Sequence, residues 1–150
     1  MSLLRRSVAL DDGVELWVEV TGSGPPIVLL HGFTGDASTM RVLTERLAVD
    51  HTVVVPNLIG HGASTGPAGN YSVDAMAEQV LAALDRIGHG APYDVVGYSM
   101  GGRVALTMAC RFPGQVASLS LIGASAGLST EDERAEREAA DARLAASILA

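Results

Sequence analysis

The sequence predicts an α/β domain in which a mostly parallel sheet carries helices on both faces. Short apolar stretches alternate with longer helical patterns along the 150 residues. Two of these stretches, 27–30 and 52–55, contain no charged residue, as expected for strands that are buried on both faces. Glycine-rich loops follow several strands, and ligands of parallel sheets bind beyond these carboxyl ends.

Composition excludes several classes of function. The hydrophobic content of 48% is enough for one core, and the net charge of -7 argues against nucleic acid or an anionic membrane as partner. Any anionic ligand must therefore be bound by a few local cations. Met1–Leu10 lacks the apolar segment of a signal peptide and no run could span a bilayer, so a cytoplasmic protein is expected. The single cysteine, Cys110, excludes an internal disulfide and is expected to be buried.

The first elements are predicted to form a hairpin. Ser7–Leu10 and Val14–Val20 flank the turn signal Asp12-Gly13. Apolar and polar residues alternate in the second strand, which favours an edge strand. The other elements expected are strands at 27–30, 52–55, 94–97 and 116–122, and helices from Asp36 or Ser38 to Ala48, at 73–87 after a Ser72 cap, after Ser99, and from Glu131 to about Leu149.

The segment Val95–Arg103 contains the candidate catalytic motif. It is predicted to form a strand, a sharp turn and a helix, with the pattern G-x-S-x-G at the turn. This spacing exposes the Ser99 hydroxyl, because the glycines on either side can approach neighbouring backbone closely. The helix N-terminus beside Ser99 favours negative charge. Ser99 is therefore the candidate nucleophile.

A second loop, His31-Gly32-Phe33, leaves the strand at 27–30. It can aim the N–H of Phe33 at the space above Ser99, where an oxyanion would lie. His31 is expected to brace this loop rather than to carry protons, and it is also a candidate substrate contact. The loop at 57–64 lacks the lysine of a phosphate-binding loop, and the apolar stripe of the helix at 73–87 is typical of core. No cofactor and no metal are predicted.

Together these motifs resemble those of the α/β-hydrolase superfamily. His31-Gly32-Phe33, the Gly60-His61-Gly62 loop and the serine turn occur in the superfamily's order. The resemblance implies that residues 1–123 are the N-terminal part of the hydrolase core and that 124–150 begin the cap. In this superfamily the acid and the histidine of the triad follow the serine. All four histidines here precede Ser99, so the sequence predicts that the triad Asp and His are absent from this chain.

A narrower resemblance is to the menaquinone-pathway family of 2-succinyl-6-hydroxy-2,4-cyclohexadiene-1-carboxylate synthases. The residues that carry it are 97–106, 124–128, Glu133-Arg134, Arg137 and Asp141. It implies elimination of pyruvate from a polyanionic substrate, with Arg103 and Arg137 holding carboxylates and the N–H groups of Phe33 and Met100 as oxyanion donors. The chain departs from the family pattern at three positions, Asn57, Ala126 and Glu138.

Two other functions remain open at this stage. One is a generic carboxylesterase or C–C hydrolase, in which the arginines are surface residues. The other is a non-catalytic module that binds a small molecule or a partner, which the missing triad histidine favours. The strand at 116–122 is expected to present an apolar sheet edge, and such edges promote self-association.

Overall fold

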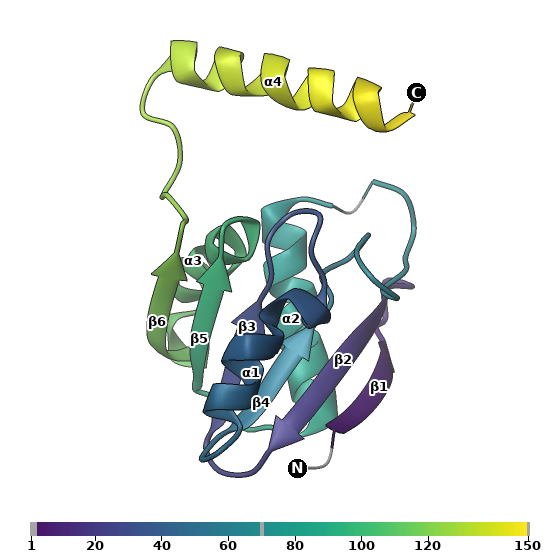
Figure 1. The fold of residues 1–150 in the computed structure, drawn as a ribbon, viewed down its shortest axis with the longest axis vertical. Coiled ribbons are helices and arrows are strands. Elements are labelled where there is room, and N and C mark those ends of the chain that lie inside the picture. The colour runs from purple at the N-terminus through teal and green to yellow at the C-terminus, as the bar shows by residue number, and fades with distance from the viewer. Residues whose placement is uncertain (1–2, 70, 150) are drawn as a thin grey trace.

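Six strands form one sheet in the computed structural model, which describes residues 3–69 and 71–149 (Figure 1). The order across the sheet is β1-β2-β4-β3-β5-β6. The strands are β1 (Leu3–Ala9), β2 (Glu15–Gly22), β3 (Pro26–Leu30), β4 (Thr52–Pro56), β5 (Tyr93–Tyr98) and β6 (Val116–Ile122). The helices are η1 (Ala37–Met40), α1 (Arg41–Leu47), α2 (Val73–Ile87), α3 (Met100–Arg111), η2 (Pro113–Gln115) and α4 (Glu131–Leu149).

The centre of the sheet is parallel. β3 pairs in parallel with β4 on one side and β5 on the other, and β6 continues this arrangement beside β5. Only the pairs β1–β2 and β2–β4 are antiparallel among the described strands. The carboxyl ends of β3, β5 and β6 therefore meet at one edge, and the loops that follow them converge there.

Helices cover both faces of the sheet, as predicted. Alternate residues of β3 point to opposite faces because side chains alternate along a strand. Val28 and Leu30 pack with α2 and α3, whereas Ile27 and Leu29 pack with η1 and α1. This two-sided burial explains why the strand has no polar residue.

The last helix is separate from this core. Residues 123–130 lead away from β6, and α4 then crosses above the carboxyl edge of the sheet (Figure 1). Its start is a capping box: Thr130 accepts from the Glu133 N–H at 3.2 Å, and the Glu133 carboxylate accepts from the Thr130 N–H at 3.0 Å. Every side chain described in α4 is exposed. None of the described helices combines the length and apolarity that a bilayer crossing requires.

Two expectations from the sequence are wrong. The strand with alternating residues, β2, lies between β1 and β4 and is not an edge strand. Its buried positions, Leu16 and Val18, join the core beneath α2, while Trp17 and Glu19 on the other face are only partly buried. The alternation thus reports complete burial on one face only. Cys110 is exposed rather than buried.

Two pairs of opposite charge within α4 do not form ion pairs among the described residues. Glu133 with Arg137, and Arg134 with Glu138, are opposite charges four residues apart, but neither forms an ion pair. The Glu133 carboxylate is occupied by the cap, and Arg134 donates to the Thr130 carbonyl instead. Arg137 pairs in the other direction along the helix.

Candidate active site

Ser99 occupies the predicted turn between β5 and α3. Its φ is 51°, a left-handed value that is strained for any residue but glycine, and such strain is concentrated at functional sites. Its N–H donates to the Ile122 carbonyl at 2.9 Å, which ties the turn to β6. A Cβ at Gly97 would lie 2.4 Å from the Gly101 oxygen, and one at Gly101 would lie 2.3 Å from the Leu30 oxygen. The glycines are therefore required by close backbone packing.

The His31-Gly32-Phe33 loop lies directly against the serine. A Cβ at Gly32 would approach the Ser99 side chain to 3.3 Å. No described residue accepts a hydrogen bond from the backbone N–H of Phe33 or of Met100. For Met100 this follows from its place in the first turn of α3, where N–H groups lack helical partners. These two N–H groups are available near Ser99, as an oxyanion site requires.

His31 is a structural brace. Its ring has no exposed surface, Nδ1 lies 2.9 Å from the Gly32 carbonyl, and Nε2 accepts from the Leu58 N–H at 3.0 Å. Burial lowers the pKa of His31, so the ring is neutral and Nδ1 is the donor to the carbonyl. A side chain with no exposed surface does not contact a ligand in a cavity. The geometry therefore supports the predicted bracing role and not a substrate contact.

Asn57 continues this bracing. Its side-chain oxygen accepts from the Ala37 N–H at 2.7 Å, and its carbonyl accepts from the Ser64 hydroxyl at 2.7 Å. The residue is 4% exposed and lies between η1 and the 57–64 loop. The side-chain oxygen and the backbone carbonyl of Asn57 thus help to hold the loops around the site.

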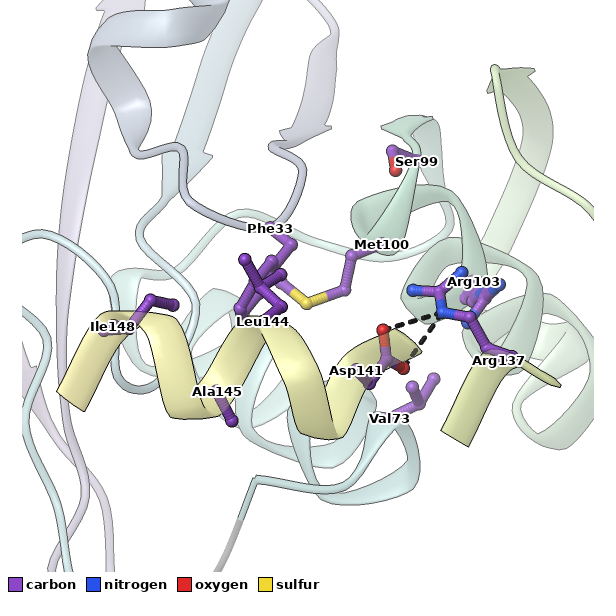
Figure 2. Close-up of a pocket in the computed structure, with 10 residues that line it drawn as sticks. All are labelled: Phe33, Val73, Ser99, Met100, Arg103, Arg137, Asp141, Leu144, Ala145 and Ile148. Atoms are coloured by element: carbon purple, nitrogen blue, oxygen red, sulfur yellow. Dashed lines mark hydrogen bonds and ion pairs between the residues drawn. The ribbon is translucent and has the colours of Figure 1, made fainter. Parts of the chain in front are cut away.

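A cavity of about 610 Å³ opens in front of Ser99 (Figure 2). Its floor comes from the core and its roof from α4. The residues that line it are Phe33, Val73, Ser99, Met100 and Arg103 from the core, and Arg137, Asp141, Leu144, Ala145 and Ile148 from α4. No histidine is among them. The structure thus brings together Ser99, Phe33, Met100, Arg103 and Arg137, five of the six residues predicted for the site.

Most of the residues that α4 contributes to the cavity lining were not predicted from the sequence. The missed residues are Asp141, Leu144, Ala145 and Ile148. Counted from Arg137 they recur at the spacing of one helix face, which is the signal that could have identified them. Two of them are large and exposed, Leu144 at 45% and Ile148 at 63%. The sequence shows that these residues share one face of α4, but it does not show that this face lies over the cavity.

The charges of the cavity come from three side chains. Arg103 is partly buried and makes no ion pair with any described residue. Arg137 contacts Asp141 through Nε, at 2.8 Å and 2.9 Å from the two carboxylate oxygens. A guanidinium that lines a cavity without an ion-pair partner favours an anion at this position, because it attracts negative charge. Groups of three or more potential metal ligands do not occur among the described residues.

The comparisons with known proteins agree with this architecture. Residues 25–145 match the family described as alpha/beta hydrolase fold, and the chain belongs to this family. In fold it is similar to the epoxide hydrolase CorEH, with a TM-score of 0.81 and 28% identity over 87% of this chain and 45% of that one. A hydrolase from Pseudomonas aeruginosa gives a TM-score of 0.80 with 28% identity, over 91% of this chain and 52% of that one.

Two relatives in sequence point to different chemistries. A Bacillus subtilis protein named "Putative 2-succinyl-6-hydroxy-2,4-cyclohexadiene-1-carboxylate synthase" is 33% identical over 95% of this chain and 53% of its own length. The pimeloyl-[acyl-carrier protein] methyl ester esterase of Chromobacterium violaceum is 37% identical over 75% of this chain and 42% of its own. The chain thus spans about half the length of these relatives or less.

Proposed function

We propose that this chain carries the nucleophile and part of the substrate site of a serine-dependent enzyme for a small carboxylate-bearing molecule. The observation that carries the proposal is Arg103, partly buried, without an ion-pair partner among the described residues, and in the same cavity as Ser99. In a chain of net charge -7, such a cation is the means of attracting an anion. A cytoplasmic location is part of this proposal.

In this proposal each role falls to residues of the chain itself. Arg103 and Arg137 hold the carboxylate, because guanidinium groups match its two oxygens. The Ser99 hydroxyl meets the reacting carbon, and the N–H groups of Phe33 and Met100 stabilise the oxyanion that develops. Leu144 and Ile148 offer apolar side chains to the rest of the substrate in the same cavity.

The general base is the part that these residues do not supply. No described histidine lines the cavity, and the hydroxyl of an unassisted serine is a weak nucleophile. We propose that the triad Asp and His belong to a further part of the hydrolase core, with residues 1–123 as its N-terminal portion and 124–150 as the start of the cap. The chain alone then retains at most oxyanion-site catalysis, roughly 10³–10⁴ over water by analogy with serine proteases.

The finer assignment is elimination of pyruvate from a polyanionic menaquinone precursor. It is supported by the two arginines and by the similarity to the Bacillus subtilis protein. Hydrolysis of an ester is the second candidate, supported by the esterase relative and by the apolar residues that dominate the cavity wall. A purely binding role is the third, supported by the absence of a histidine from the described lining.

Binding and labelling separate these candidates. Titration with succinate and with its dimethyl ester, followed by NMR of the folded chain, measures whether carboxylate charge is recognised. The carboxylate proposal expects succinate to bind and the diester to bind more weakly; the reverse order favours the esterase. A fluorophosphonate probe should label Ser99 only slowly, with Ser99→Ala as the unlabelled control. Rapid stoichiometric labelling would mean that a histidine of this chain serves as base, against the proposal.

Self-association through β6 is part of the same proposal. Within the described sheet β6 is an edge strand, and its last two residues, Leu121 and Ile122, are 41% and 46% exposed. An unpaired edge with apolar side chains and no charge recruits another strand. Sedimentation should detect dimers, and Leu121→Lys should reduce them. A monomer at all concentrations in the unmodified chain would exclude this contact.

A further inference from the structure

The Arg137–Asp141 pair in the cavity wall forms through a single nitrogen of the guanidinium. The Nε atom alone donates to both carboxylate oxygens, at 2.8 Å and 2.9 Å (Figure 2). No described residue accepts from the two terminal nitrogens of the same guanidinium. Asp141 therefore occupies one edge of the group and leaves free the end that binds a carboxylate through two parallel bonds.

Stability of α4 does not account for this pair. Both side chains are about half exposed, 51% for Arg137 and 56% for Asp141, and pairs of that kind contribute little because water screens them. The arginine also precedes the acid by four residues, which is the less favourable order on a helix. The effect of the pair is instead local: it restricts a long side chain that would otherwise sample many rotamers.

The charges within the cavity also favour a restraint of Arg137 by Asp141. Arg103 lines the cavity without an ion-pair partner among the described residues, so Arg137 shares this space with a second positive charge. Like charges repel, and an unrestrained Arg137 on an exposed helix is free to turn toward solvent. The Asp141 carboxylate offsets this repulsion and, by accepting from Nε with both oxygens, favours the rotamer in which the guanidinium lies on the cavity side.

We infer that Asp141 is a positioning residue, which fixes the guanidinium of Arg137 in the cavity with its terminal nitrogens directed to an incoming carboxylate. The inference rests on the proposed function for its ligand, but the fixing of Arg137 is a property of the free chain. It differs from the opposite reading, in which Asp141 competes with the ligand for Arg137. The two readings predict opposite signs when Asp141 loses its charge.

Succinate affinity provides the first test. Asp141→Asn should weaken binding about three- to tenfold, the range expected when an oriented charge-assisted contact is loosened. Glu138→Gln is the matched control, because it removes one negative charge from α4 at a residue outside the cavity lining, and it should leave affinity within about twofold. In an Arg137→Ala background, Asp141→Asn should have no further effect on affinity. With Arg137 present, Asp141→Glu should retain part of the affinity that Asp141→Asn loses. Unchanged or tighter binding by Asp141→Asn would overturn the inference.

A measurement without ligand tests the positioning of Arg137 separately from the proposed carboxylate function. The Nε–H group of Arg137 should give a resolved NMR signal, shifted and slow to exchange with water, in the unmodified chain and in Glu138→Gln. Asp141→Asn should return that signal to the position of a free arginine. If the signal behaves so but succinate does not bind, the carboxylate function fails and the positioning of Arg137 stands. If the unmodified chain already gives the free signal, the inference is wrong whatever binds. Circular dichroism verifies that α4 remains helical.

Discussion

The core and α4 contribute to one cavity but are held in place by different forces. In the core, β3 is buried by strands on both sides and by helices on both faces, and Leu29 and Leu30 have no exposed surface. In α4 every described side chain is exposed, and local bonds at the cap and between Arg137 and Asp141 are its main polar contacts. Ser99 and the N–H groups proposed as oxyanion donors thus lie on the well-packed part, as chemistry that depends on sub-ångström geometry requires. The cavity residues of α4 lie on the part with little packing.

The largest expected difference between the two regions is in the free energy of unfolding. Leu30→Ala removes a fully buried side chain and should lower this free energy by about 2–5 kcal/mol. Leu144→Ala, in the exposed wall of the cavity, should change it by no more than about 0.5 kcal/mol. Urea unfolding followed by circular dichroism measures both. Equal losses would mean that α4 packs as part of the core.

A smaller difference is expected for ligand affinity. Arg103, from α3, should be the stronger of the two cations, because it is partly buried and unpaired among the described residues. Arg103→Ala should weaken succinate binding by about 1.5–3 kcal/mol. Arg137→Ala should weaken it less, because that side chain is half exposed to water. Arg143→Ala, on α4 but outside the lining, is the control. If neither cavity substitution alters affinity, a simple esterase becomes the better description.

Lowering the pH should destabilise the core through His31. Burial lowers the pKa of His31 in the folded state below its usual 6.5. Below pH 6.5 the unfolded chain therefore binds a proton that the folded chain does not, so the free energy of unfolding falls as the pH drops through this window. Urea unfolding at a series of pH values measures the slope. His31→Gln should reduce it, whereas His89→Gln, in a loop remote from the cavity, should not.

The smallest expected effect is the loss of the cap at the start of α4, which should occur at a lower pH than the effect of His31. Backbone N–H groups of Thr130 and Ser129 lower the pKa of Glu133 below its usual 4.5. The cap is thus complete above pH 4.5 and is lost as the pH falls through the lowered pKa. Amide signals at 129–134 should broaden or shift there, before the core changes. Glu133→Gln should remove this step at acid pH, and simultaneous changes in the core amides would contradict the separation of the two regions.

The sequence by itself determined the local features. Ser72 caps α2, and this helix has the predicted bounds Val73–Ile87, because a cap and an apolar period act within a few residues. The sharp turn at Ser99 was predicted from its flanking glycines, which pack where a side chain cannot, and Ser99 has a positive φ there. The capping box of α4 likewise joins two residues three positions apart, Thr130 and Glu133. In each case the residues that interact are close in the sequence.

Only the tertiary structure decided which surfaces meet. The alternation in β2 predicts one buried face but not its neighbours, so its position inside the sheet had to be observed. The helical period predicts α3 but not which side of its last turn is covered, and Cys110 proved to be exposed. The sequence predicted that His31 braces its loop, but only the structure showed its burial and its partner, the N–H of Leu58, 27 residues later. Asp141 became a cavity residue only because the 123–130 loop carries α4 over Ser99. Such contacts depend on how distant elements pack, and the residues of one element do not encode them alone.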